Sequence, residues 1–315
     1  MALIQTIVTR NEADLALVNI QFHLESGVDH IVLTDHQSTD GLRDHLSPFI
    51  DQGVLTYLRQ ETPGFYQSKW VSDMADMARI DLGARWVINT DSDEFWVAKN
   101  GKPLKSAFKM RPFTNVLRAK RHDFICPEQN HPSFWETMIY RKVKSTNSLG
   151  DALPDKIAHR CAPNLTIHAG NHDISGYPIK RPRSGLLEVL HFPIRSEAQF
   201  KQKIIQGTQS LTQAPDIKLG IGQTWRQQYT ELNKTGKLNY ITENILTADQ
   251  IRTGLADGSL VKDTRLRDKM VSLSPEQNAL ARIQPSESPP HMTCPLYTPD
   301  AAHPPTPTPH CRSLV

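Results

Sequence analysis

The most informative stretch of this sequence is an apolar run, Trp86–Thr90, that ends abruptly in three carboxylates before the chain becomes apolar again at Phe95. Asp91 and Asp93 flank one small residue, so in extended geometry both side chains point to the same face. Carboxylates placed where a buried strand leaves its sheet can hold one hard divalent cation against a phosphate-bearing substrate. The spacing therefore indicates an enzyme that binds Mn²⁺ or Mg²⁺ and neutralises a departing diphosphate.

The elements that position these carboxylates alternate regularly over the first hundred residues. Short buried strands that alternate with helices indicate βαβ crossovers, and hence a mostly parallel sheet. We predict an α/β, Rossmann-like fold with helices on both faces, in which ligands bind beyond the carboxyl ends of the strands. The expected strands are Leu3–Thr9, His30–Thr34, Val54–Leu58 and Trp86–Thr90, and the expected helices are Asn11–Ser26, a segment from Gly41 to about Phe49, and Ser68–Leu82.

Polar residues follow three of these strands, at the edge where such sheets bind ligands. Arg10, Asn11 and Glu12 come after the first strand, Asp35 after the second, and the acidic turn after the fourth. The carboxyl ends of parallel strands meet at one edge. The convergence of several polar strand ends therefore favours a binding site over a solvated acidic loop.

Beyond Lys99 the alternation weakens. Val116–Ala119, Phe124–Cys126 and Trp135–Lys144 are expected to form further strands, whereas Asp151–Phe192 has few long periodic runs and is expected to carry acceptor-binding loops. From Ser196, a good N-cap residue, the pattern becomes helical.

The C-terminal end differs in composition from the rest. Nine of the chain's 22 prolines lie after Gln284, together with many Ser, Thr and His residues. Such a segment buries too little apolar surface to order itself. We expect a catalytic domain over 1–195, a helical C-terminal extension over 196–284 and a Pro-rich disordered tail over 285–315.

Charge and cysteine usage narrow the class of protein. With 36 basic and 33 acidic residues, the chain lacks the strong positive field expected of a nucleic-acid-binding protein. The four cysteines form no C-x-x-C pair, which favours a reduced, cytoplasmic compartment. No apolar run is long enough to span a membrane, and the first strand begins almost at Met1, so we expect neither a membrane span nor a signal peptide.

Four motifs, in order and at matching spacing, carry a family resemblance. The sequence resembles the glycosyltransferase family 2 superfamily, in the branch with R/K-N-E after the first strand, Y-H-x-x-x-G-V-D-H at the end of the first helix, D-x-x-S-x-D-G, and D-x-D-E-F. The corresponding stretches here are Thr9–Glu12, Phe22–His30, Asp35–Gly41 and Asp91–Phe95. The resemblance covers residues 1–200 and is strongest up to residue 97.

The resemblance implies a glycosyltransferase A-type fold and a nucleoside-diphosphate-sugar donor. It assigns Asp91 and Asp93 as ligands of the metal and the diphosphate. It also implies that Asn11, Glu12 and Asp35 line the nucleoside pocket, and that Arg10 bonds to phosphate.

Three further assignments rest on the resemblance. Leu190–Ser196 is similar to an H-Y/F-x-x-R-S segment, so His191 is expected to complete the metal shell, with His168 and His172 as competitors for that role. Gln67 and Lys69 resemble a donor-contacting stretch. The chain is expected to transfer a sugar, with inversion, to a glycan or lipid-linked acceptor, which would bring a cytoplasmic protein to the inner face of a membrane.

The residue that accepts the proton of the acceptor hydroxyl is left open. An inverting transferase needs such a base, and no acidic pair stands at the position where the relatives have one. Asp123, Glu136, Asp155 and Asp173 are all candidates.

Other functions remain as alternatives. A non-catalytic sugar- or partner-binding module could keep the fold without turnover. A nucleotidyltransferase would need a Gly-rich basic loop where Arg10–Glu12 stands, and dinucleotide or P-loop enzymes would need glycine motifs that this sequence lacks.

Overall fold

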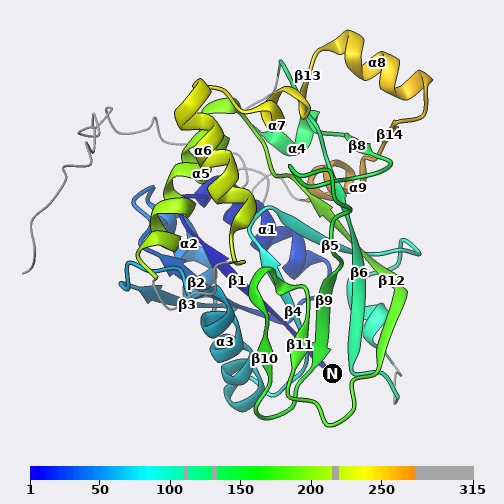
Figure 1. Cartoon of the computed structure of the whole chain (residues 1–315). Helices are drawn as coiled ribbons and strands as arrows, with labels where there is room; N and C mark the ends of the chain where they lie inside the picture. Colours follow the sequence, from blue (N-terminus) through cyan, green and yellow to red (C-terminus); the bar gives the residue numbers. More distant parts are fainter. Residues whose placement is uncertain (110–112, 130–132, 215–219, 274–315) are drawn as a thin grey trace, which may run out of the picture. The chain divides into compact units, whose positions relative to one another are not determined.

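The computed structural model describes residues 1–109, 113–129, 133–214 and 220–273, and its centre is one eight-stranded sheet (Figure 1). The strand order is β3-β2-β1-β4-β9-β6-β12-β5. All neighbours are parallel except at β9 and β5, which run against the others. These strands span β1 Ala2–Thr9, β2 His30–His36, β3 Leu55–Gln60, β4 Ala84–Asp91, β5 Glu94–Ala98, β6 Val116–Asp123, β9 Lys156–Arg160 and β12 Pro182–His191.

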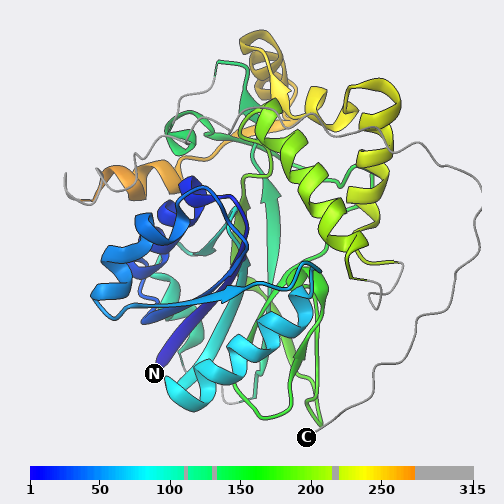
Figure 2. The ribbon, with the colours of Figure 1, turned by 90° about the vertical axis from the view of Figure 1, so that its left-hand side faces the viewer.

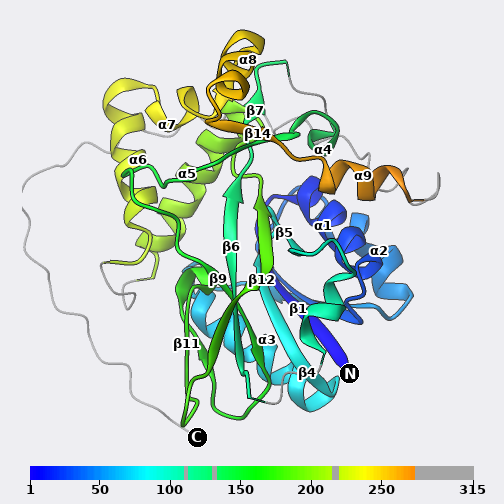
Figure 3. The same cartoon turned by 90° about the vertical axis from the view of Figure 1, so that its right-hand side faces the viewer.

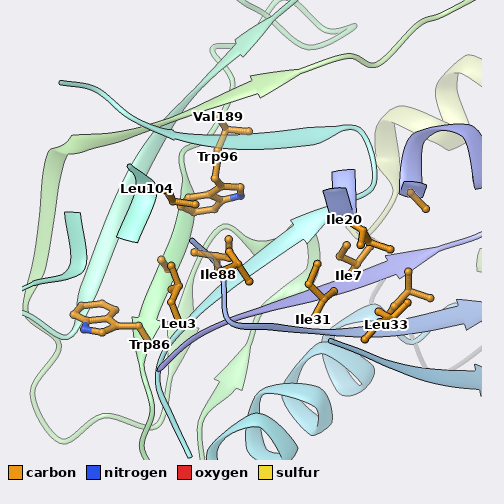
Figure 4. Packing of buried hydrophobic residues seen from close by; sticks show 14 of the residues in the cluster. Leu3, Ile7, Ile20, Ile31, Leu33, Trp86, Ile88, Trp96, Leu104 and Val189 are labelled. Atoms are coloured by element: carbon orange, nitrogen blue, oxygen red, sulfur yellow. The ribbon is translucent and has the colours of Figure 1, made fainter. Parts of the chain in front are cut away.

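Helices cover both faces of this sheet, and β1 presents apolar residues to each of them. Leu3 and Ile7 pack against the side of α1 (Ala13–Glu25) and α2 (Leu42–Asp51), whereas Ile4 and Val8 pack towards α3 (Gln67–Asp81). Figure 2 shows the blue helices and the cyan helix α3 separated by the strands. Figure 4 shows the first of these cores, where Ile20 of α1 meets Ile7 and Ile31. The expected Rossmann-like α/β architecture is thereby confirmed.

The C-terminal helices continue this unit, which extends over Met1–Pro285. The helix α5 (Glu197–Thr212) packs against α6 (Gln223–Thr235), and its N-cap is Ser196, as expected from the sequence. Two short strands of this region pair with earlier segments, β13 with β7 and β14 with β8. The bounds are α4 Phe134–Thr137, α7 Asn239–Thr242, α8 Ala248–Ala256, α9 Arg265–Val271, β7 Cys126–Pro127, β8 Tyr140–Lys142, β10 Thr166–Ile167, β11 Ile174–Ser175, β13 Ile245–Leu246 and β14 Leu260–Lys262, with 3₁₀ turns at Leu104–Phe108 and Ala169–Asn171.

Two local expectations are wrong. The segment expected to be a strand over Trp135–Lys144 begins inside α4 and contains only the short strand β8. The stretch Asp151–Phe192, expected to be loops, supplies two strands of the large sheet, β9 and β12, and β12 runs beside β6 (Figure 3). β9 begins with Lys156, and the first four residues of β12 are exposed, so neither strand shows the continuous apolar run of a buried strand. The expected tail over 285–315 lies outside the described residues. Within the described part of the chain, no helix has the length and apolar content to cross a membrane.

A buried histidine joins α1 to β5. His23 is fully buried; its Nδ1 lies 2.8 Å from the carbonyl oxygen of Asn19, and its Nε2 accepts the backbone N–H of Trp96 at 3.0 Å. Nε2 must therefore be unprotonated, and Nδ1 carries the proton. Burial lowers the pKa of His23 to about 4.

This histidine predicts an acid-sensitive fold. In the unfolded chain His23 binds a proton below about pH 6.5, whereas the folded chain excludes it until about pH 4, so stability falls as the pH is lowered between these values. His23 contributes about 1 kcal/mol per pH unit in this window. Urea unfolding of the wild type and of His23→Gln at several pH values should show the smaller slope in the variant. Equal slopes would contradict the assignment.

Candidate functional site

The polar strand ends meet at the edge formed by the carboxyl ends of the parallel strands. Asp91 lies beside Val8 in the register of β4 and β1, and Asp35 lies beside Thr9. His191, the last residue of β12, is the register partner of both Asp123 on β6 and Glu94 on β5. Because β9 and β5 run in the opposite direction, their first residues, Lys156 and Glu94, lie at this same edge.

Hydrogen bonds to its backbone carbonyl groups hold the acidic turn between β4 and β5 in place. Asn19 of α1 donates its side-chain amide to the carbonyl oxygens of Ser92 at 3.0 Å and Glu94 at 2.8 Å. The carbonyl oxygen of Asp93 accepts the N–H of Phe192 at 2.9 Å. Asn19 is itself fixed by Gln5 of β1, whose Nε2 donates to its Oδ1 at 2.7 Å. These buried bonds fix the directions in which the three carboxylates of the turn point.

The first aspartate is paired with a buried lysine. Lys156 Nζ lies 2.7 Å from Asp91 Oδ2 and 2.8 Å from Glu94 Oε1, and the lysine side chain is 1% exposed. The other oxygen of Asp91 accepts from Gln67 Nε2 at 2.8 Å and Asn171 Nδ2 at 3.4 Å. Burial would raise the pKa of Asp91, but the charge and hydrogen bond of Lys156, together with the charge of Lys203, hold it below its usual value.

The second aspartate has a different pair of partners. Asp93 Oδ2 lies 2.7 Å from Lys203 Nζ on α5 and 3.6 Å from His191 Nε2. The other ring nitrogen of His191, Nδ1, lies 2.6 Å from Asp123 Oδ1. Burial would lower the pKa of His191, yet the two aspartates raise it to about 9. Burial likewise opposes ionisation of Asp93, but Lys203 and His191 hold the pKa of Asp93 well below its usual value.

The residues after β1 and β2 interlock at the same edge. The backbone N–H of Asn11 donates to Ser38 Oγ at 2.9 Å, and Asn11 Oδ1 accepts the N–H of Thr39 at 2.8 Å. Asn11 has a positive φ of 51°, which asparagine tolerates better than most residues. Asp35 is fully buried; its Oδ2 accepts from Arg59 at 2.7 Å and from Tyr57 at 2.5 Å. Much of the D-x-x-S-x-D-G stretch thus builds the wall of the site.

The structure gives different surroundings to the three candidate histidines and to Lys69. His191 joins the acidic cluster, whereas His168 Nε2 lies 3.1 Å from Ser175 Oγ, and His172 Nδ1 lies 3.1 Å from the carbonyl oxygen of Asp155. Lys69 pairs with Asp73 on its own helix at 2.6 Å and is largely exposed.

The four candidate bases also lie in different places. Asp123 is almost fully buried and contacts His191 and, at 3.4 Å, Tyr240. Asp173 pairs with Lys180 at 2.7 Å beside the β10–β11 hairpin. Glu136 lies in the short helix α4, and Asp155 directly precedes β9. Of these four, Asp123 is the residue whose contacts tie it to the acidic turn.

The donor set at the turn fits a divalent cation. Asp93, Glu94 and His191 each offer a ligand atom, and these atoms all lie within 4.8 Å of one another. Two carboxylates and an imidazole suit Mn²⁺ well and Mg²⁺ less closely. The hydrogen bond from His191 to Asp123 is the kind of outer contact that orients a ligating imidazole. Asp91, expected from the sequence to be a ligand, lies next to this set and is engaged by Lys156.

Comparison with known proteins gives structural similarity only. No family model matches the chain, and no curated protein matches it. The chain is similar to S. aureus TarS in complex with UDP, with 13% identity over 74% of this chain and 78% of that chain, at a TM-score of 0.40. It is similar to the mannosyltransferase PcManGT from Pyrobaculum calidifontis in complex with GDP-Man and Mn²⁺, with 14% identity over 89% and 84% of the two chains, at a TM-score of 0.39. Similarity at this level carries no argument about function.

Two functional candidates escaped the sequence reasoning. Lys156 begins a strand that was not expected, and Lys203 lies within the expected helix, where a lysine is normally exposed. Neither lysine belongs to a motif. The available signal was the excess of carboxylates at the predicted edge, since buried carboxylates need cationic partners.

Loss of the buried lysine should destabilise the fold. Lys156→Met leaves Asp91 and Glu94 without their shared cation, at an expected cost of about 3–5 kcal/mol at neutral pH. The deficit should shrink at lower pH, because unpaired buried carboxylates take up protons more readily than those of the unfolded chain. Chemical denaturation measures it, with Lys120→Met at an exposed position of β6 as the control. A variant as stable as this control would contradict the role of Lys156.

Proposed function

We propose that this chain is a metal-dependent glycosyltransferase of A-type fold, which moves a sugar from a nucleoside-diphosphate sugar to the hydroxyl group of a glycan or lipid-linked acceptor. The observation that carries the proposal is the convergence of Asp93, Glu94 and His191 at the carboxyl edge of a mostly parallel sheet. This is where α/β sheets bind nucleotides. The motif resemblance of residues 1–97 supplies the reaction class.

The chain's own residues account for donor binding and for the departure of the diphosphate. Asp93, Glu94 and His191 would hold the cation, and Asp91 lies beside them. When bound, a divalent cation supplies positive charge for the departing diphosphate. Arg10, Asn11 and Glu12 follow β1 beside the end of β2, where a nucleoside would lie. Asp35 is fully buried and accepts from Arg59 and Tyr57, so it would support this pocket without contacting the nucleoside.

Asp123 fits a positioning role better than the role of base. Its two carboxylate oxygens contact His191 and Tyr240, and it is 1% exposed, so an acceptor hydroxyl has little access to it. Its hydrogen bond fixes the ring of His191 with Nε2 towards Asp93. Glu136, Asp155 and Asp173 therefore stay open as bases, and inversion stays an expectation of the resemblance.

The test combines nucleotide binding with donor hydrolysis. The melting temperature is measured with UDP and with GDP, each with and without Mn²⁺ or Mg²⁺. The nucleotide of the natural donor should raise the melting temperature, and the metal should add to the shift. The matching sugar nucleotide should then be hydrolysed slowly to free sugar and nucleoside diphosphate. Asp93→Asn should abolish the metal-dependent shift and lower hydrolysis by about a hundredfold.

The control is Asp76→Asn, which removes an exposed carboxylate paired with Arg79 on α3. It should behave as the wild type. Metal-dependent binding without hydrolysis would favour a binding module, and release of pyrophosphate from a nucleoside triphosphate would favour a nucleotidyltransferase. Either result would refute the proposal.

A further inference from the structure

One face of α5 covers the turn that follows β1. Three consecutive residues of that turn each bond to a residue of α5, and the three helix residues are spaced so that they share one face. The pairs are Arg10 with Ser210 (Nη1 to Oγ, 2.6 Å), Asn11 with Gln206 (Nδ2 to Oε1, 3.2 Å) and Glu12 with Lys203 (Oε1 to Nζ, 3.0 Å). These are the turn residues expected to contact the donor, so this face of α5 is a wall of the same site.

Lys203 lies at the centre of this contact. Its ammonium group bridges Glu12 and Asp93, at 3.0 Å and 2.7 Å. Its side chain is 24% exposed, against 12% for Glu12 and 4% for Asp93. The lysine is therefore the member of the trio most accessible to a ligand entering from solvent.

The ammonium group shares one oxygen with the candidate metal site. Asp93 Oδ2 contacts Lys203 and also faces His191 at 3.6 Å. A divalent cation held by Asp93, Glu94 and His191 would share this carboxylate with Lys203, and two cations at one carboxylate repel each other. A diphosphate changes this balance, because its oxygens can accept from the lysine and coordinate the metal at once.

We propose that Lys203 is a diphosphate-binding residue of the donor site. Without donor it neutralises Glu12 and Asp93; with donor its ammonium group turns to the diphosphate and leaves Asp93 to the metal. The assignment rests on the proposed function and adds to it a residue of α5 that binds the diphosphate of the nucleotide.

The test is a pair of affinities measured on Lys203→Met. Electron paramagnetic resonance reports binding of Mn²⁺ alone, and calorimetry reports binding of UDP or GDP in the presence of Mn²⁺. The variant should bind Mn²⁺ alone at least as tightly as the wild type, because a competing cation is gone. It should bind the nucleotide with Mn²⁺ about tenfold more weakly or worse, because a phosphate contact is gone.

Two further variants test whether the position and the charge of Lys203 matter. Lys201→Met is the matched control, since Lys201 is also on α5 but pairs with Glu197 at 2.7 Å, and both its affinities should equal those of the wild type. Lys203→Arg keeps the charge and should recover most of the nucleotide affinity. If Lys203→Met does not fold, the double variant Glu12→Gln with Lys203→Met is compared with Glu12→Gln alone, because Glu12 also lies in the donor site. The additional loss of nucleotide affinity then belongs to Lys203.

Other outcomes would overturn the proposal. Nucleotide affinity of Lys203→Met within about twofold of the wild type would exclude a phosphate contact of any strength. An equal loss of both affinities would show that Lys203 only holds α5 in place. A wild type that binds neither UDP nor GDP with Mn²⁺ would instead refute the glycosyltransferase proposal, and this assignment with it.

Discussion

The rest of the site depends on the balance of charge at the carboxyl edge of the sheet. Buried carboxylates are costly unless cations and hydrogen-bond donors compensate them. Here the acidic groups interleave with cationic ones, so that each contacts at least one partner. The carboxylates are Glu12, Asp91, Asp93, Glu94 and Asp123, and the cationic partners are Lys156, Lys203, Arg121 and His191. A buried ion pair adds little to stability by itself, so this arrangement is better explained by a function of the edge than by the needs of the fold.

The cationic partners of Asp91 and Asp93 come from different kinds of element. Lys156 reaches the edge because β9 is antiparallel, and its burial leaves it no room to exchange one partner for another. Lys203 comes from a helix laid over the edge and keeps some exposure. Asp91 is thus paired with a buried lysine of the sheet, whereas Asp93 is paired with a partly exposed lysine of α5. The donor set consists of Asp93, Glu94 and His191. Asp91 lies beside it and shares Lys156 with Glu94.

The sequence predicted the parts of the fold that depend on local periodicity. The alternation over residues 1–97 predicts β1 to β4 and α1 to α3, and the polar residues after those strands predict the edge that carries Asp93. It could not predict β9 or β12, because a strand whose polar end belongs to the site loses the apolar pattern of a buried strand. Lys156 and Lys203 were missed for a related reason. Their partners are 65 and 110 residues away, and the pairings exist only once the sheet order is known.

The position of Lys203 bears on the domain division expected from the sequence. A boundary at residue 195 would separate Lys203 from Glu12 and Asp93, and would leave the turn after β1 without its helical cover. The site is therefore shared between the sheet and α5, with Arg195 at the junction bonded to Asp14 of α1 at 3.0 Å. Asn19 of α1 holds the acidic turn, whereas one of the cations beside Asp93, Lys203, comes from α5. The proposed turn of Lys203 from Asp93 to the diphosphate would therefore leave the backbone hydrogen bonds of the acidic turn in place.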